Sequence, residues 1–382
     1  MSRPNAHGGI RWHWTTPRAQ AILRRRSLSE ILAFYRELNH LPQEEPGVLL
    51  GYSTSYISRV ETGSRTITDI GALRHIAERL GLPPHVFGIT DDADGDHRAM
   101  IQFGESVLRL ADIARQAGHA AAAVDELWPL VARLEAGAAD GHADTDVLRL
   151  LARARVGLGV ALGHVLPEER LATAARWTGK GVAVARRLDD PTLHAHALRH
   201  HGNELRKAGL HHAALERLGR ARDLSRTADE RAAAVILLAR AAGTAGATKV
   251  FDDAVAECRS LLETASVTPL FSEFTVHEVH LRGLAATGRT RQAVDLLARS
   301  PAPGLQASPQ WRIISAITAG EVLLRRGGRD AAAAQMRSAL QGAELHRLPH
   351  QVQRVVRASD SLPDVREQAQ NTLARLRADI AA

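Results

Sequence analysis

The sequence predicts an all-α protein in which a small N-terminal domain precedes a long array of helical hairpins. Alanine, leucine and arginine dominate the composition, and these residue types favour helix over strand. No run of alternating β-branched residues indicates a sheet. Glycines recur in the C-terminal part at steps of 37 to 43 residues, a period typical of stacked helical hairpins. A chain of 382 residues is long enough for two or more domains.

Residues 1–26 are predicted to form a basic N-terminal arm that contains Trp12 and Trp14 and ends in three consecutive arginines. Such an arm can lie along a DNA groove or stack on a partner. We favour the alternative that the two tryptophans fold back as apolar anchors on the first domain, because tryptophan is usually buried. Helix is expected over residues 17–38, with Ser27 as an internal break or an N-cap.

Residues 43–63 have the spacing of a helix-turn-helix. Residues 51–53 supply a tight turn after a short apolar segment, and the Ser53 hydroxyl can cap a second helix. Ile57 and Val60 lie three apart on the inner face of that helix. The residues that then point outward are Thr54, Ser55, Ser58, Arg59 and Thr62. A short exposed helix with hydroxyls and an arginine can meet base edges in a major groove, which indicates a DNA-binding protein.

The same segment resembles the lambda-repressor-like, or Xre-type, helix-turn-helix over roughly residues 28–88. In that family pattern, the second helix begins at the position of Gln43 and the turn is made at the position of Gly51. The closing positions of the pattern are occupied here by Ile57, Val60, Glu61 and Gly63. The resemblance implies an ion pair between Glu61 and Arg36 on the first helix. Such a pair is expected to be partly buried, where removing one partner costs about 3–5 kcal/mol.

The resemblance also implies roles for the polar residues of the motif. Thr54, Ser55 and Arg59 are implied to contact bases, and Ser58 lies on the same outward face. Phosphate contacts are implied for Gln43, Ser53, Tyr56 and Arg65. The alternative is that these groups merely solvate a surface helix. The two interpretations are even for Ser55 and Ser58, whereas the motif favours DNA contact for Arg59 and Gln43.

The sequence departs from the family pattern at Pro46 and Gly47, where leucine and alanine are usual. Proline is tolerated in the first turn of a helix but clashes further inside, and glycine costs about 0.5–1 kcal/mol of backbone entropy. We therefore expect the second helix to be short, bent or late to start. The same departure supports an alternative in which the helix-turn-helix has decayed or serves as a protein contact.

A further helix is expected to begin at Asp69 and to stop at Gly81, which completes a helix-turn-helix domain over residues 27–89. An acidic linker is predicted at residues 90–97. A calcium loop is rejected there, because the twelfth position of the loop would be Ile101 in place of a glutamate.

Residues 98–382 are predicted to form an α-solenoid of six or seven tetratricopeptide-like helical hairpins. Small residues recur on one helix face at Gly159, Gly202, Gly243, Gly283 and Gly320. Turn glycines precede alanine-rich second helices at Gly118, Gly209, Gly288 and Gly328. Alanine and glycine at helix crossings allow close approach, and stacking of the hairpins supplies the core. The concave surface of such an array suits an extended peptide, a ligand or another subunit.

Nineteen histidines raise the question of a metal site. His196 and His200 lie four apart on one predicted helix, but neighbouring residues point to different faces and no HExxH motif occurs. We expect a polar, pH-responsive concave lining there, and keep a metal-dependent hydrolase as the weakest hypothesis. No P-loop or nucleophile elbow occurs either. The sequence therefore assigns no catalytic residue, cofactor or metal.

Charge and cysteine usage narrow the protein class further. The net charge is +7, and residues 1–90 hold eleven arginines against seven carboxylates, so positive charge is densest beside the DNA-binding motif. Cys258 is the only cysteine, which excludes an internal disulfide. Neither an apolar signal segment nor a membrane-spanning stretch occurs, so no membrane partner and a cytoplasmic location are expected.

These observations predict a sequence-specific, DNA-binding transcription regulator and not an enzyme. Its partner would be double-stranded DNA bound by a homodimer, because one such helix reads few bases. A peptide, a small molecule or a protein partner would bind the repeat domain and modulate the regulator. The alternative is a tetratricopeptide-like interaction scaffold whose helix-turn-helix does not bind DNA.

Overall fold

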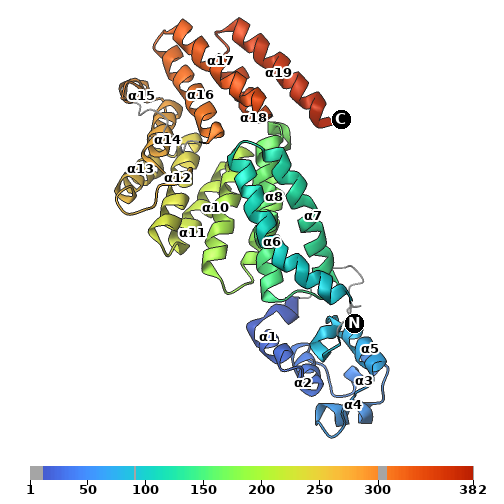
Figure 1. The fold of residues 1–382 in the computed structure, drawn as a ribbon. Coiled ribbons are helices and arrows are strands. Elements are labelled where there is room, and N and C mark those ends of the chain that lie inside the picture. The colour runs from blue at the N-terminus through green and yellow to red at the C-terminus, as the bar shows by residue number, and fades with distance from the viewer. Residues whose placement is uncertain (1–11, 90–91, 300–307, 382) are drawn as a thin grey trace. The chain divides into compact units, whose positions relative to one another are not determined.

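The computed structural model describes residues 12–89, 92–299 and 308–381, and within these ranges every regular element is a helix (Figure 1). This confirms the predicted all-α class. The N-terminal elements, in chain order, are η1 (Trp12–Thr15), α1 (Pro17–Arg24), α2 (Leu28–Leu38), α3 (Glu45–Leu50), α4 (Thr54–Glu61), α5 (Ile70–Leu80) and η2 (Pro84–Phe87).

Short polar side chains begin four of the N-terminal helices, and Thr16 caps α1. The hydroxyl of Ser27 accepts a hydrogen bond from the backbone of α2, and the Asp69 carboxylate does so for α5, with an Ala72 N to Asp69 Oδ1 distance of 2.7 Å. Ser53 has the same role for α4. Each cap satisfies a backbone N–H that has no partner within its helix, which fixes where the helix starts.

One apolar core joins the N-terminal helices. It is built around Ile31, Leu32, Ile57, Ile76 and Leu80, which are fully buried. The centre of α2, the inner face of α4 and the inner face of α5 therefore pack on one another.

The segment from Trp12 to Arg24 is part of this folded unit. Trp14 is only 3% exposed, and its indole Nε1 donates a hydrogen bond to the Leu80 carbonyl at 2.9 Å. Ala19 of α1 is fully buried in the same core. The interpretation of Trp14 as an apolar anchor is therefore confirmed. Residues 1–11 of the predicted arm lie outside the described residues.

The second helix of the motif is short and starts late, as Pro46 and Gly47 predict. Helix α3 has six residues and begins at Glu45, which places Pro46 in its first turn. Gly47 is buried where α3 meets the turn before α4. A Cβ atom at this position would lie 2.9 Å from the Tyr52 carbonyl oxygen, so the close approach requires glycine.

Helix α6 (Asp92–Gln116) starts inside the segment predicted as an acidic linker. Residues 92–97 are therefore helical and not an irregular hinge. Helices α7 (Ala120–Ala139) and α8 (Thr145–Val165) follow.

The chain divides into two compact units, and the division passes through these three helices. One unit comprises residues 1–107 and 129–151, and the other comprises residues 108–128 and 152–382.

The second unit continues as an array of helical hairpins (Figure 1). After η3 (Glu168–Arg170), its helices are α9 (Leu171–Ala185), α10 (Pro191–Lys207), α11 (His211–Leu224), α12 (Ala228–Ala245), α13 (Thr248–Leu261), α14 (Glu273–Ala286), α15 (Thr290–Leu297), α16 (Pro309–Arg325), α17 (Arg329–Leu345), α18 (Pro349–Ala358) and α19 (Pro363–Ala381). Consecutive helices contact each other throughout the array, which confirms the predicted repeat architecture. Among the described residues, no helix has both the length and the apolar character needed to cross a membrane.

The recurring glycines lie where helices cross. A Cβ atom at Gly159 of α8 would lie 2.7 Å from the Thr178 backbone nitrogen of α9. At Gly283 of α14 it would lie 2.0 Å from the Phe251 ring of α13. The recurring glycines of the sequence thus mark close helix crossings, at which small residues let neighbouring helices approach.

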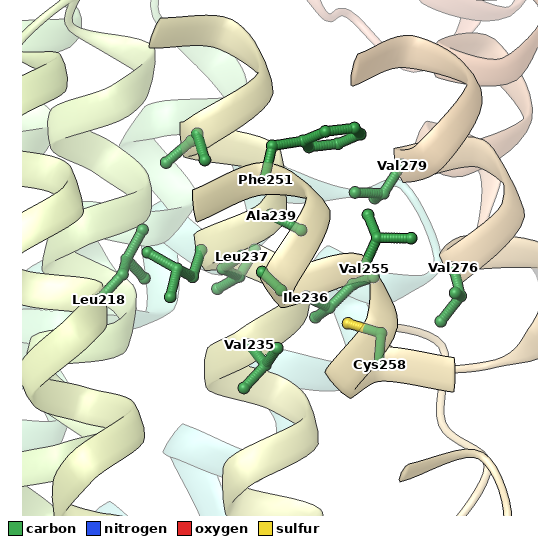
Figure 2. Close-up of a cluster of buried hydrophobic side chains, with 14 of the residues drawn as sticks. Leu218, Val235, Ile236, Leu237, Ala239, Phe251, Val255, Cys258, Val276 and Val279 are labelled. Carbon is green, nitrogen blue, oxygen red and sulfur yellow. The ribbon is translucent and has the colours of Figure 1, made fainter. Parts of the chain in front are cut away.

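The core of the array is continuous over several hairpins. Figure 2 shows its central part, where Leu218, Ile236, Phe251 and Val279 come from α11, α12, α13 and α14. Cys258 lies in the same cluster, and burial raises the pKa of its thiol to about 12, so the thiol stays protonated at neutral pH. The side chains of several hairpins are therefore needed to enclose each apolar face.

The early and late parts of the array also contact each other, through polar groups. The Glu168 backbone N–H donates to Gln353 Oε1 at 2.7 Å, and Gln353 Nε2 donates to Glu169 Oε2 at 3.0 Å. Ion pairs join Glu169 to Arg377 at 2.7 Å and Glu168 to Arg357. We name these five residues the end-to-end contact. It joins η3 to α18 and α19 across nearly two hundred residues of sequence.

Candidate functional site

Helix α4 separates an apolar face from a polar one. Ile57 and Val60 are buried in the core, whereas Thr54, Ser55 and Arg59 are exposed. About two turns of one helix thus present hydroxyls and a guanidinium to solvent, while two aliphatic side chains pack in the core. This is the arrangement that a base-reading helix requires.

The N-terminal end of α4 is fixed by hydrogen bonds of the predicted site residues. Ser53 Oγ accepts from the Tyr56 backbone N–H at 3.3 Å. Gln43 lies outside α3, and its Nε2 donates to Ser58 Oγ of α4 at 3.2 Å. The structure therefore brings Gln43 onto the same surface as Ser53 and Ser58. All three side chains keep exposed or half-buried polar atoms.

The two arginines of the motif have different surroundings. Arg59 folds back along its own helix, and its Nε donates to the Ser55 carbonyl at 3.1 Å. Arg65 lies in the turn after α4, with its guanidinium carbon 4.4 Å from the centre of the Tyr56 ring. Arg59 is thus carried on the exposed face of the helix, and Arg65 is positioned beside it by an aromatic ring.

A tyrosine missed by the sequence analysis completes this surface. Tyr52 stacks on Tyr56 with ring centres 5.0 Å apart and an angle of 13° between the rings. Burial, followed by the charges of Tyr56 and Asp69, raises the pKa of Tyr52, so its hydroxyl remains a hydrogen-bond donor at neutral pH. The spacing of four between the two tyrosines, one in the turn and one in α4, was the available signal.

Arg36 and Glu61 are brought together across α2 and α4. Arg36 Nε lies 3.4 Å from Glu61 Oε1, and the side chains are 36% and 7% exposed. Neither of these two atoms has a hydrogen-bond partner, so the pair is a charge contact without hydrogen-bond geometry. Its contribution to stability should therefore fall below that of a fully buried, hydrogen-bonded pair.

A second candidate site lies between helices of the hairpin array. Two adjoining pockets, of about 580 and 390 Å³, share His164, Asn203, Arg240 and Gln310 in their walls. Their lining comes mainly from α6, α8, α10, α12, α14, α16 and α18. We name the two pockets together the concave cavity. Its volume lies within the range of ligand sites of about 300–1,000 Å³.

The histidines of α10 line this cavity. His196 and His200 have ring centres 4.5 Å apart, and the Arg199 guanidinium lies 3.2 Å from His196 Nδ1 and 3.3 Å from His200 Nε2. Burial, with the charge of Arg199, lowers the pKa of His196 to about 3, and burial also lowers that of His200 well below its ordinary value. Both rings are neutral at pH 7 and accept from the arginine. The lone pairs of these two ring nitrogens are used in accepting hydrogen bonds from Arg199.

Within the described part of the chain, no cluster of three or more histidine, cysteine or carboxylate side chains has an arrangement that would hold a metal ion.

Comparison with known proteins supports the N-terminal assignment. Residues 23–87 match the family model described as a helix-turn-helix domain. No curated protein matches the chain. Similar solved structures include a Rap protein complexed with Competence and Sporulation Factor (12% identity, 73% of this chain and 78% of that chain, TM-score 0.49). Two others are Bacillus thuringiensis PlcR in complex with the peptide PapR7 and DNA (12%, 91% and 99%, TM-score 0.27) and a mutant of PrgX (10%, 84% and 95%, TM-score 0.27).

At these identities and TM-scores, the architecture rests on the helices of this chain and not on the likeness. The family match and the observed helices together give its organisation. The chain carries a helix-turn-helix domain within residues 23–87, followed by an array of tetratricopeptide-like helical hairpins.

Proposed function

We propose that the protein is a sequence-specific transcription regulator that binds operator DNA through α4. The observation that carries the proposal is the separation of faces on this helix, within a segment that matches a helix-turn-helix domain. An exposed helix of hydroxyls and one guanidinium has the donors and acceptors that distinguish base edges in a major groove. A cytoplasmic location accords with this partner.

Each site residue has a proposed role that follows from its position. Thr54, Ser55, Ser58 and Arg59 face the base edges. Gln43, Ser53, Tyr56 and Arg65 contact phosphates on either side of the groove. The stacking of Arg65 on Tyr56 supports a phosphate contact, because it orients a guanidinium without neutralising its charge.

The regulator is proposed to act as a homodimer. One α4 helix reaches only a few base pairs, whereas two helices on half-sites about one DNA turn apart multiply the specificity. The hairpin array is proposed to receive a peptide or small-molecule effector in the concave cavity. Such an effector controls DNA binding only if it binds one conformation of the array better than another.

The departures at Pro46 and Gly47 no longer support a decayed motif. Pro46 lies in the first turn of α3, where proline is tolerated. Gly47 allows the close approach of α3 to the turn before α4. Both residues thus fit a packed helix-turn-helix.

A salt titration of DNA binding tests the proposal. Binding of the full-length protein to duplexes selected from a random pool is measured by fluorescence anisotropy beside a scrambled duplex. The selected duplex should bind about a thousandfold or more tightly, and both affinities should fall steeply with salt. Equal, salt-insensitive affinities for the two duplexes would instead support the interaction scaffold.

A further inference from the structure

The lining of the concave cavity has a large excess of positive charge. Ten arginine or lysine side chains line its two pockets, against two carboxylates, Asp112 and Glu168. These two carboxylates already pair, with Arg115 and Arg357 respectively. Among the described residues, no further carboxylate lines the two pockets.

Four guanidinium groups concentrate this charge at one end of the cavity. Arg206, Arg240, Arg282 and Arg354 come from α10, α12, α14 and α18, and we name them the arginine cluster. Nearby acids offset them only in part. Glu204 pairs with Lys207 at 2.9 Å and its charge also acts on Arg206. Glu278 acts on Arg240 and Arg354, and Glu321 acts on Arg354.

Neutral groups position these arginines. Arg206 donates from Nε and Nη2 to Asn203 Oδ1 at 3.3 and 3.1 Å, and Arg354 donates from Nη1 to Gln351 Oε1 at 2.9 Å. Amide oxygens orient a guanidinium but leave its charge in place. Structural arginines in protein interiors are usually balanced by carboxylates, because an unbalanced buried charge is costly.

Arg240 is the clearest example. Its guanidinium carbon lies 4.8 Å from the centre of the Trp311 ring, and its Nε is buried without a hydrogen-bond partner. Burial and the charges of Arg206, Arg282 and Arg354 lower its pKa well below the ordinary value. Burial, with neighbouring arginines, likewise lowers the pKa of Arg206 and of Arg354 to about 9. An anion placed among these groups would relieve both the repulsion and the missing hydrogen bond.

We propose that the arginine cluster binds the oxyanion head, carboxylate or phosphate, of the ligand that occupies the concave cavity. Guanidinium groups match the geometry of both oxyanions and can bind them through two parallel hydrogen bonds. The larger pocket adds apolar side chains, among them Val160, Leu237 and Ile314, that suit an apolar body. The ligand is therefore an amphiphile with an anionic end. This inference rests on the proposed role of the hairpin array as the effector-binding domain.

Calorimetric titration of the full-length protein, without DNA, tests the inference. The probes are inorganic pyrophosphate, a tetraglutamate peptide and a neutral tetraglutamine peptide, all in potassium chloride at one ionic strength. Pyrophosphate or tetraglutamate should bind at a single site, and tetraglutamine should not. A preference for pyrophosphate would assign a phosphate head, and a preference for tetraglutamate would assign a carboxylate head.

Single substitutions locate the binding. Arg240→Gln and Arg354→Gln should each weaken the preferred anion about tenfold to a hundredfold, the range for one hydrogen bond to a charged group. Arg240→Lys, which keeps the charge, should lose less. Arg325→Gln removes an exposed arginine outside the cavity and should bind as the wild type does. Circular dichroism establishes whether each variant is folded. If Arg240→Gln does not fold, Arg354→Gln alone tests the inference.

Two results would overturn the inference. One is that neither anion binds the wild-type protein above the chloride background. The other is that Arg325→Gln weakens binding as much as the cluster variants do. The proposed regulatory function is measured separately, by DNA binding in buffer without pyrophosphate or peptide, so either proposal can fail while the other stands.

Discussion

At the scale of single residues, Arg59 and Arg65 show how the surroundings of one side-chain type decide its proposed role. Arg59 extends along the exposed face of α4, whereas Arg65 lies over the Tyr56 ring in the following turn. The sequence predicted the positions of both arginines. It did not predict the stack of Tyr52, Tyr56 and Arg65, because the contact depends on the angle between the turn and the helix.

Alanine substitutions should separate the two roles. Arg59→Ala should lower the preference for the selected duplex over the scrambled one about tenfold or more, because a base contact contributes about 1–3 kcal/mol of discrimination. Arg65→Ala should weaken both duplexes alike and reduce the salt dependence by about one phosphate contact. Anisotropy titrations at several salt concentrations measure both effects. Arg325→Ala is the control, because it removes one positive charge from the other compact unit. Equal losses on both duplexes for Arg59→Ala would contradict its role as a base reader.

Gly47 has no side chain, and a larger residue would not fit between α3 and the turn before α4. In Gly47→Ala, the new methyl group would meet the Tyr52 carbonyl at 2.9 Å and the Thr54 nitrogen at 3.3 Å, both of them backbone atoms that move only with the turn. We expect a loss of about 1–3 kcal/mol in the free energy of unfolding of the helix-turn-helix domain. Urea denaturation measures it. Val48→Ala on the same helix is the control, because Val48 is 80% exposed. An unchanged midpoint for Gly47→Ala would show that the turn adjusts freely.

At the scale of helices, the sequence predicted the hairpins well because their packing contact recurs. Gly159 and Gly283 lie at such crossings. The start of α6 was less predictable. Aspartate and glycine are typical of linkers, but aspartate also suits a helix N-terminus, and the single sequence does not decide between the two.

Two glycine substitutions in helices should have opposite effects. Gly283→Ala places a methyl group 2.0 Å from the buried Phe251 ring and should destabilise the array by about 1–3 kcal/mol. Gly219→Ala in α11 has no atom within 4 Å of the new methyl group and should stabilise the array by about 0.5–1 kcal/mol, because alanine favours helix. Thermal unfolding followed by circular dichroism measures both. If both variants raised stability, or both lowered it, the packing argument would be contradicted.

At the scale of the whole molecule, the arginine cluster could not be predicted from the sequence. Its four members lie between 34 and 148 residues apart and meet because α10 packs on α12, α12 on α14, and α14 reaches α18 through α16. The histidine-rich lining was predicted, because His196 and His200 lie on one face of one helix. Local spacing in the sequence therefore identified the histidines of the cavity, which belong to one helix. It did not identify the arginine cluster, whose members come from four helices.

Stability should fall between pH 7 and pH 5 because of the buried histidines. Burial lowers the pKa of His196 to about 3 and those of His201 and His280 to about 4, whereas the unfolded chain has a histidine pKa of about 6.5. Above pH 6.5 these groups are neutral in both states. Below it, the unfolded chain binds protons that the folded protein does not, so stability decreases as pH falls toward the folded values.

His196 alone should lower the free energy of unfolding by about 1.4 kcal/mol for each pH unit well below pH 6.5. Urea denaturation at pH 7, 6 and 5 measures the total change in the free energy of unfolding. His196→Gln should have a shallower dependence than the wild type. An identical pH dependence of stability in the two proteins would show that groups other than His196 cause the response.

The end-to-end contact makes the packing of η3 on α18 and α19 sensitive to salt. Glu168 and Glu169 are held to these helices by ion pairs with Arg357 and Arg377. All four side chains are partly exposed, and salt screens such charges over about 10 Å at 0.1 M. Higher ionic strength should therefore loosen this contact, and should shorten the time for which the proposed effector stays bound.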